Sequence, residues 1–300
     1  MSHDHKHNHI TSTTGRLFLT MVLNFTITAA EIIGGILSGS LSLISDALHN
    51  FSDGISVILS YIAIKLKSRK NSYNHTFGLK RAEILAAALN SSTLIVISIY
   101  LFYEAVQRFF NPQIIEAQLM IIVASIGLAA NIAGTLLLHR DSKNSINIKA
   151  SYLHLLSDAV SSVAVILGGL AIYLLNVYWI DPLLTILIGI YIVWESFKIL
   201  SDATHILMEG TPENISVKEI KKLVSEIRGV VDIHHIHVWS VGENDIHLEA
   251  HVNINDMMIS ESVDIRLLIE NTLNEKFGIN HVTLQLECNN CKDTSLIHQH

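Results

Sequence analysis

Two pairs of potential metal ligands stand out because each lies inside a run that is otherwise apolar. His49 and Asp53 occur in "LISDALHNFSDG", and His154 and Asp158 occur in "YLHLLSDAVSS". In each pair the residues are four positions apart, which on an α-helix places both side chains on one face. A charged side chain at bilayer depth is costly and marks a functional site by default. The repeated spacing therefore predicts one site with four ligands, built from two membrane helices.

The chemistry of this ligand set points to a transported metal. Two imidazoles and two carboxylates suit a tetrahedral Zn²⁺ ion, and the charges of the ion and the carboxylates sum to zero. Without the ion, two desolvated carboxylates would lie close together and take up protons. Metal and H⁺ would then compete for one site, as an antiporter requires. The alternative for each pair is helix packing, and Asp46 is expected to act indirectly or to lie on the access path.

The elements that hold these residues are predicted to be membrane helices. About half of the 300 residues are apolar and 16% are charged, against roughly 25% charged residues in soluble domains. Long apolar segments occur only before residue 200, and each is long enough to cross a lipid bilayer. We therefore expect six transmembrane helices. They cover residues 17–38, 41–64, 82–106, 119–138, 148–175 and 177–199.

Charge predicts the orientation and the domains. Lys and Arg gather between the second and third segments and between the fourth and fifth, so both connections, and with them both termini, are expected in the cytoplasm. Residues 1–208 carry a net charge of +1 and residues 209–300 a net charge of −8. An acidic soluble domain excludes nucleic acid as a partner and suits cations. The predicted parts are a disordered His-rich tail (1–12), a membrane domain (13–207), a cytoplasmic domain (208–288) and a C-terminal tail (289–300).

The cytoplasmic domain is predicted to have the α+β order αββαβ. Helical periodicity and alternation give this order, which fits a small sheet with two helices on one face. In the first strand, alternation places His235 and His237 on one face and His234 on the other. In the second strand, His247 and His251 share a face.

Two cysteines and a His-rich tail add further candidate ligands. Cys288 and Cys291 are the only cysteines, and disulfides are rare on the cytoplasmic side of a membrane. Their spacing is typical of zinc and redox sites. A metal would also need His or Glu partners, from a dimer interface or from the N-terminal tail; otherwise both residues are simple thiols. The tail carries His at positions 3, 5, 7 and 9 and is interpreted as a loose arm that captures metal.

Taken together, these segments resemble the cation diffusion facilitator family of zinc and related divalent metal transporters. The matching stretches include "EIIGGILSGSLSLISDALHNFSDG", "HTFGLKRAEILAA", "HLLSDAVSSVAVILGG", "DPLLTILIGIYI" and "ILMEGTP". The resemblance implies a homodimer with six helices per subunit and a ferredoxin-like cytoplasmic domain. It also implies export of Zn²⁺ from the cytoplasm in exchange for H⁺, through a transport site formed by His49, Asp53, His154 and Asp158.

The resemblance also implies metal ligands in the cytoplasmic domain. Alignment with the family points to His234, His247 and Glu287 as ligands of a regulatory metal cluster, with His281 as the next candidate. Gln285 stands where some members have a His, which argues against a second ion there.

Other positions that match the family lie outside the two ligand sets. His75 stands where some members have a ligand of an extra loop site, but Leu79 occupies the position of their second His. Arg81 and Glu209 match positions that form a charge interlock in relatives. The chain has no long His-rich loop between the fourth and fifth helices, which favours a bacterial inner membrane.

Two other classes of protein were weighed against a transporter. A membrane metalloenzyme needs an open coordination position and a positioned base, and the sequence has no His-Glu-x-x-His motif, so we expect no enzyme. A membrane metal sensor that moves no ion would explain the cytoplasmic ligands, but not two ligand pairs at bilayer depth. Within transporters, a preference for Cd²⁺ or Co²⁺ stays open, because both ions accept the same ligands.

Overall fold

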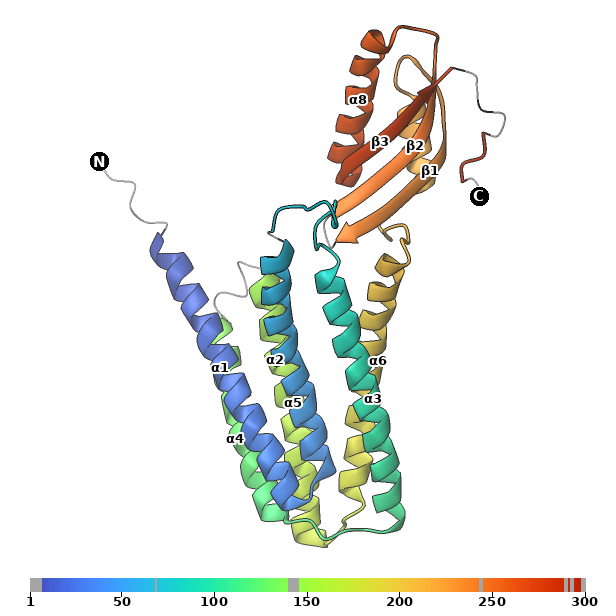
Figure 1. Ribbon diagram of the computed structural model, residues 1–300. Coiled ribbons are helices and arrows are strands. Elements are labelled where there is room, and N and C mark those ends of the chain that lie inside the picture. The colour runs from blue at the N-terminus through green and yellow to red at the C-terminus, as the bar shows by residue number, and fades with distance from the viewer. Residues whose placement is uncertain are drawn as a thin grey trace, which may run out of the picture. The chain divides into compact units, whose positions relative to one another are not determined.

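Six long helices make up the N-terminal part of the chain in the computed structural model (Figure 1). The structure describes residues 7–67, 69–139, 146–242, 245–288, 291 and 294–297, without side chains at 7–21, 23, 57, 60, 64, 67, 137–138 and 146–151. Each predicted apolar segment corresponds to one helix. The helices are α1 (His7–Ser38), α2 (Leu41–Lys67), α3 (Ala82–Phe110), α4 (Ala117–Leu138), α5 (Ile146–Leu175) and α6 (Ile180–Leu207).

Four of these helices can cross a membrane by length and composition. In the described part of the chain they are Ala82–Phe110, Ala117–Leu136, Tyr152–Leu175 and Ile180–Leu207. A shorter apolar stretch, Asn24–Ser38, lies in α1. A count of six spans also needs α1 and α2.

The first helix begins earlier than predicted. α1 starts at His7, inside the segment 1–12 for which we expect a disordered tail. Extending an existing helix by a few residues costs far less than starting a new one, so the apolar stretch of α1 can continue into the polar residues before it. His3 and His5 lie outside the described residues.

Contacts divide the chain into two units, Met1–Leu59 with Leu89–Ile199, and Ser60–Ala88 with Leu200–His300. In the first unit, α4 packs against both α1 and α5. The interior near these contacts contains Leu43, Met120 and Val165, all fully buried. Gly34 lies directly against Val123 of α4, since a Cβ at position 34 would come within 2.6 Å of its side chain. Small residues of this kind let membrane helices approach closely.

A buried carboxylate fixes the start of α2. Asp181, in the first turn of α6, is fully buried. Its oxygens accept hydrogen bonds from the backbone N–H groups of Leu41 (2.9 Å) and Ser42 (3.1 Å), and from the hydroxyls of Ser40 and Ser42, both at 2.6 Å. The first N–H groups of a helix have no partner within the helix. Asp181 therefore satisfies donors of α2 with a side chain from α6, and ties the two helices together.

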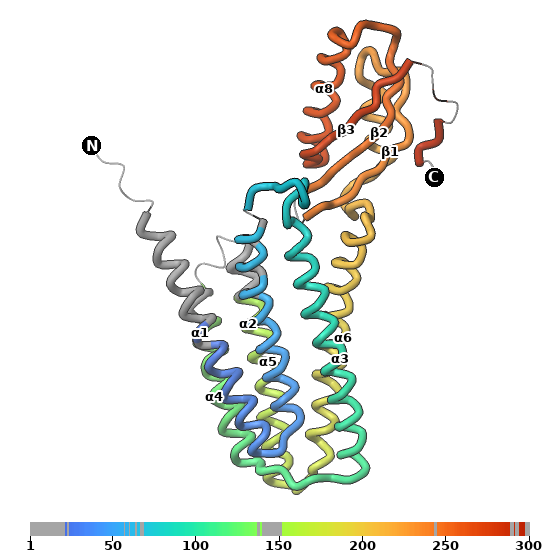
Figure 2. Tube along the Cα trace, viewed as in Figure 1, coloured from blue at the N-terminus to red at the C-terminus, as the bar shows by residue number. Residues whose placement is uncertain are grey.

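The C-terminal elements of the second unit form a small three-stranded sheet with two helices. They are α7 (Val217–Ser225), β1 (Val230–Gly242), β2 (Asp245–Ile254), α8 (Ile259–Phe277) and β3 (Ile279–Glu287), in the predicted order. β2 lies between β1 and β3 (Figure 2). It runs antiparallel to β1 and parallel to β3.

One apolar core joins the two helices to the sheet. Ile220 of α7 and Leu273 of α8 are fully buried with Ile233 and Val252 of the strands, which confirms that both helices share one face. Local sequence sets the ends of the helices. Ser216 accepts a hydrogen bond from the N–H of Glu219 at the start of α7, and Gly278 ends α8 with a left-handed φ of 67°, a conformation that glycine adopts without strain. Buried residues of this core include Ile220, Val224, Ile233, Leu248, Val252, Ile269 and Leu273.

The anchor at the start of α2 predicts a loss of stability on substitution. Asp181→Ala would leave two backbone N–H groups and two hydroxyls without their acceptor, at a cost of about 1–3 kcal/mol for each buried group that stays unsatisfied. We expect the midpoint of thermal unfolding in detergent to fall by several degrees. Asp202→Ala, which removes an exposed carboxylate of α6, is the control. Equal midpoints for the two variants would contradict the anchoring role.

Candidate functional site

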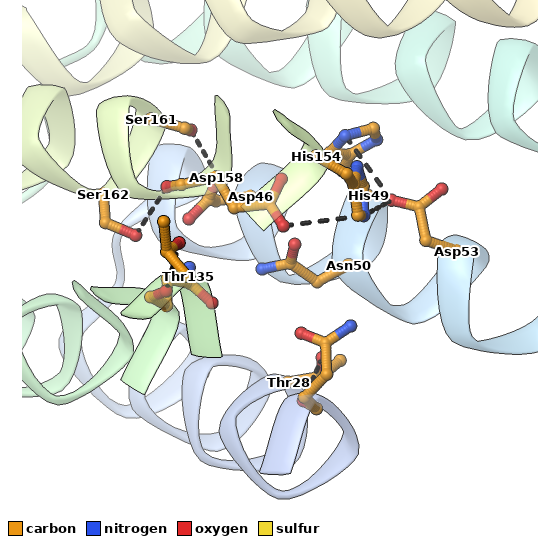
Figure 3. Close-up of polar contacts among 12 residues, drawn as sticks. Thr28, Asp46, His49, Asn50, Asp53, Thr135, His154, Asp158, Ser161 and Ser162 are labelled. Atoms are coloured by element: carbon orange, nitrogen blue, oxygen red, sulfur yellow. Dashed lines mark hydrogen bonds and ion pairs between the residues drawn. The ribbon is translucent and has the colours of Figure 1, made fainter. Parts of the chain in front are cut away.

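α2 and α5 bring the four predicted membrane ligands together (Figure 3). His154 Nε2 lies 3.3 Å from Asp53 Oδ2 and 3.5 Å from Asp158 Oδ2. His49 Nε2 lies 3.5 Å from the same oxygen of Asp53, and the ring centroids of His49 and His154 are 6.1 Å apart. Each helix contributes one His and one Asp a single turn apart, so helical spacing stacks the side chains as expected. We call these residues the four-ligand group.

The four side chains differ in their exposure. The Asp158 side chain is 2% exposed and that of His49 11%, whereas those of Asp53 and His154 are 30% and 37% exposed. The group thus has a buried side and an accessible side within the first unit.

Two further contacts lie beside the four-ligand group. The hydroxyl of Ser161 donates to a carboxylate oxygen of Asp46, and Asp46 is buried. The ring of Tyr191 meets that of His49 edge-on, with centroids 6.1 Å apart. Outer contacts of this kind fix the orientation of metal ligands and tune their basicity. Asp46 therefore contacts α5 through a serine, in line with the indirect role expected for it.

Two buried residues of the bundle escape the sequence analysis. The side-chain amide of Asn50 donates to Glu31 Oε2 over 3.1 Å, from α2 to α1, and both residues are fully buried. Glu31 carries the same signal that identified the four ligands, an acidic side chain inside an apolar run. Applied to α1, that rule would have found it.

In the cytoplasmic domain, a β-bulge changes which histidines can meet. The register pairs His234 with His251 and His237 with Glu249, so β1 has one extra residue between these pairs. His235 lies in the bulge with a left-handed φ of 49°. The rings of His234 and His235 both approach that of His251, with centroids 5.6 and 4.9 Å away. Alternation predicts opposite faces for His234 and His235, and this prediction is wrong because the bulge breaks the alternation.

The C-terminal segment brings a cysteine to these histidines. The N–H of His235 donates to the carbonyl of Ser295 (3.1 Å), and the N–H of Ile236 donates to the carbonyl of Leu296 (2.9 Å). The chain after β3 thus returns along β1. One ligand atom from each of four residues lies within 4.8 Å of the others, and these residues, the Cys291 group, are His234, His235, His251 and Cys291.

A carboxylate adjoins this group. His234 Nε2 lies 2.9 Å from Glu287 Oε1, and His251 Nδ1 lies 3.7 Å from Glu287 Oε2. The structure thus brings the predicted residues His234 and Glu287 together. Imidazole, thiolate and carboxylate ligands are those that Zn²⁺ accepts, so the chemistry of these side chains fits a bound ion.

The other two predicted residues of the cytoplasmic domain form a separate pair. β2 and β3 place His247 opposite His281, with ring centroids 4.4 Å apart. Phe77 packs edge-on against both rings, and Trp239 lies beside His247. The four residues predicted for one cluster therefore lie in two places, His234 with Glu287 and His247 with His281.

Two candidate ligands with described side chains, His75 and Cys288, lie outside the groups of potential metal ligands found in the described part of the chain. His75 is exposed and belongs to none of the groups of three or more potential ligands found among the described residues. Cys288 is exposed, whereas Cys291 is half-buried. His7 and His9 lie in α1, and their side chains are outside the described part.

The predicted charge pair at the start of α3 is present. Arg81 Nη2 lies 3.0 Å from Glu209 Oε1, with both residues in the second unit. A neighbouring ion pair joins Lys80 Nζ to Asp245 Oδ1 at 2.8 Å. These two pairs connect the residues before α3 to the junction after α6 and to the start of β2.

Family models match almost the whole chain. A cation efflux transmembrane domain matches residues 17–208, and the cytoplasmic domain of cation efflux proteins matches residues 212–288. A cadmium, cobalt and zinc/H(+)-K(+) antiporter of Bacillus velezensis is 40% identical over 287 residues, or 94% of this chain and 91% of the relative. The zinc transporter ZitB of Pectobacterium atrosepticum is 37% identical over 295 residues, or 98% and 91%. The metal cation efflux system protein CzcD of Cupriavidus metallidurans is 33% identical over 292 residues, or 97% and 92%.

The fold and the matches define an integral membrane transporter of metal cations, with a helical transmembrane domain and a cytoplasmic domain that contains a small sheet. The chain belongs to the cation efflux family, also called the cation diffusion facilitators. This confirms the resemblance found in the sequence. The family consists of transporters and not of enzymes.

The His247 pair predicts a pH dependence of the sheet. Burial lowers the pKa of His247, and the neighbouring His281 and Lys80 lower it further, against the opposing effect of Asp245. The unfolded chain takes up this proton near pH ~6.5, so below that pH the unfolded state binds more protons than the folded one. The free energy of unfolding must then fall as the pH falls through this range, and is fully retained above it.

With metal removed by a chelator, we expect amide protection of β1 and β2 in the full chain to decrease from about pH 8 to about pH 6. Hydrogen–deuterium exchange, corrected for its intrinsic pH dependence, measures this. His247→Gln should reduce the decrease, and His75→Gln, at an exposed position, should leave it unchanged. If amide protection falls by the same amount in His247→Gln as in the wild type, the pH dependence does not come from His247.

Proposed function

We propose that this chain exports Zn²⁺ from the cytoplasm in exchange for H⁺, through His49, Asp53, His154 and Asp158. The observation that carries the proposal is the convergence of these four side chains from α2 and α5, with contacts of 3.3–3.5 Å. The family supports divalent metal efflux. The choice of zinc and of the proton rests on the chemistry of the ligands.

Zinc is favoured by the ligand types. Two imidazole nitrogens and two carboxylate oxygens match its preference for four nitrogen, sulfur or oxygen donors, whereas Mg²⁺ and Ca²⁺ need more oxygen ligands than this group offers. Cd²⁺ and Co²⁺ accept the same donors. The name of the Bacillus velezensis relative includes all three metals, so export of Cd²⁺ or Co²⁺ is the second candidate.

Proton exchange is supported by the burial of Asp158. Asp158 is buried, and its Oδ2 has no hydrogen-bond donor among the described residues apart from the contact with the His154 ring. Metal binding needs deprotonated ligands, so it releases protons, and protonation favours release of the metal. A proton gradient directed into the cell can therefore drive metal out.

The proposed organisation places six spans in a bacterial inner membrane, with both termini in the cytoplasm. The membrane domain would cover residues 13–207 and the cytoplasmic domain 208–288, flanked by the tails 1–12 and 289–300. The ranges of the family models, 17–208 and 212–288, support these limits. A homodimer is proposed because the cytoplasmic family model is that of a dimerisation domain.

Within the cytoplasmic domain, we propose regulatory metal binding at the Cys291 group. Two of its four residues, His234 and His235, are buried, and Glu287 adds a carboxylate beside His234. An ion there would join β1, β2 and the C-terminal segment, and would thereby stabilise one arrangement of the domain. The separate pair His247 and His281 offers two imidazoles and is the weaker candidate.

The transport proposal predicts coupled flux that depends on Asp158. In proteoliposomes of the full chain, with a zinc dye and a pH dye recorded together, Zn²⁺ and H⁺ should move in opposite directions. Asp158→Asn should lower Zn²⁺ flux by at least ~100-fold, the upper range of what loss of an outer-shell partner costs a metal site. Asp202→Asn makes the same change at an exposed position and should transport normally.

Three outcomes distinguish the candidates. Flux that persists in the Asp158 variant would place the transport path elsewhere. Metal binding without flux in the wild-type chain would make the protein a sensor. Faster flux of Cd²⁺ or Co²⁺ than of Zn²⁺ under the same gradient would favour the second candidate.

The Cys291 group predicts a spectroscopic signature. Co²⁺ bound to a thiolate gives an intense charge-transfer band, which His and Asp ligands alone do not give. We expect this band when the full chain in detergent is titrated with Co²⁺, and we expect Cys291→Ser to abolish it. Cys288→Ser is the matched control, because Cys288 is exposed and outside the group. A band lost with Cys288 and kept without Cys291 would contradict the ligand assignment.

A further inference from the structure

A fourth buried acid of the bundle has no part in the transport chemistry described so far. Glu31, at the centre of the apolar stretch Asn24–Ser38 of α1, is 0% exposed. It is the only acidic residue of α1. A carboxyl group at this depth is expensive to keep, whatever its protonation state, and needs a physical reason.

Only one of the two carboxyl oxygens of Glu31 accepts a hydrogen bond from the described residues. Oε2 accepts a hydrogen bond of 3.1 Å from the side-chain amide of Asn50, the residue next to His49. Oε1 is buried and has no hydrogen-bond partner among the described residues. On α4, Gly127 makes room for this oxygen, since a Cβ there would lie 2.2 Å from it. The neighbouring interface between α1 and α4 also contains the buried polar residues Thr28 and Asn131.

Glu31 lies among other buried acids of the bundle and has no positively charged partner in the described part of the chain. The described residues give it no ion pair, and α2 and α5 carry two further buried acids, Asp46 and Asp158. The sequence of α4, Ala117–Leu138, contains no charged residue. An ionised Glu31 would thus be a third negative charge in an apolar interior, and a proton on the carboxyl removes that cost. A divalent cation in the four-ligand group would offset the negative charges and make ionisation less costly.

We propose that Glu31 is a proton-carrying residue of the transport cycle that does not bind the metal itself. It holds a proton while the four-ligand group is without metal and releases it when the metal is bound. In that step the O–H bond of the carboxyl group breaks and the proton leaves to water, and the reverse step restores it when the metal departs. Asn50 connects Glu31 to the helix turn that carries His49. The inference rests on the proposed metal and proton exchange and adds a residue to its proton path.

The test compares Glu31→Gln with the wild-type full chain in proteoliposomes. Gln keeps the size of the side chain and an oxygen that accepts from Asn50, but cannot exchange a proton. We expect the ratio of transported protons to Zn²⁺ to fall by about one proton per ion, with Zn²⁺ affinity changed by less than about threefold. Glu31→Asp should restore the wild-type ratio at least in part. Glu116→Gln, the same change at an exposed position before α4, should leave the ratio unchanged.

A ratio equal to that of the wild type in the Glu31→Gln chain would overturn the inference and leave the proposed function intact. Absence of proton-coupled flux in the wild type would instead refute the proposed function. If the variant transports too slowly for a ratio, calorimetric titration of the full chain in detergent with Zn²⁺, in two buffers of different ionisation enthalpy, counts the protons released on binding. Fewer protons released in Glu31→Gln than in Glu116→Gln would support the role, and equal numbers would refute it.

Discussion

The cost of burying charge in an apolar bundle governs the arrangement of this membrane domain. Asp181 meets that cost with four hydrogen bonds from the start of α2, so its charge is balanced by the protein itself. Asp53 and Asp158 contact imidazole rings, and the Oδ2 atom of each has no such donor among the described residues. In the proposed transport cycle, their charge is balanced by a proton or by the metal ion. The number of hydrogen bonds that each carboxylate accepts thus distinguishes Asp181, a structural carboxylate, from Asp53 and Asp158, which we propose to exchange ions.

Where sequence patterns describe local geometry, the structure follows them. The six long helices and the order αββαβ come from hydropathy and periodicity, which depend on neighbouring residues alone. The spacing of four between His49 and Asp53, and between His154 and Asp158, fixes a shared helix face. That α2 and α5 then face each other is a matter of tertiary packing. In the sequence, the packing of α2 against α5 was indicated only by the repetition of the same His and Asp pair on both helices.

The cytoplasmic ligands show where local patterns fail. Strict alternation separates His234 from His235, but one extra residue in β1 brings both next to His251. A bulge of this kind depends on the pairing of two strands and on a residue with left-handed backbone dihedrals. The residue types at this position do not predict either feature. Cys291 reaches the histidines because the chain after β3 pairs with β1, a long-range contact without a sequence signal. His247 lies opposite Trp239 and not opposite His234, because register and not residue type decides which ligands meet.

The two ligand groups of this chain suit different tasks because their donors differ. A transported ion must leave again, and two ligands of the four-ligand group are about one-third exposed, with oxygen donors that protons can reclaim. The Cys291 group instead offers imidazoles and a thiol, with His234 and His235 buried, a set that binds Zn²⁺ more firmly than carboxylates do. An ion bound to the Cys291 group would exchange slowly. This group would also bind metal at lower concentrations than the four-ligand group does. If both proposed sites bind metal, the Cys291 group would bind its ion at a lower metal concentration than the four-ligand group. The cytoplasmic domain would then already hold an ion when transport begins.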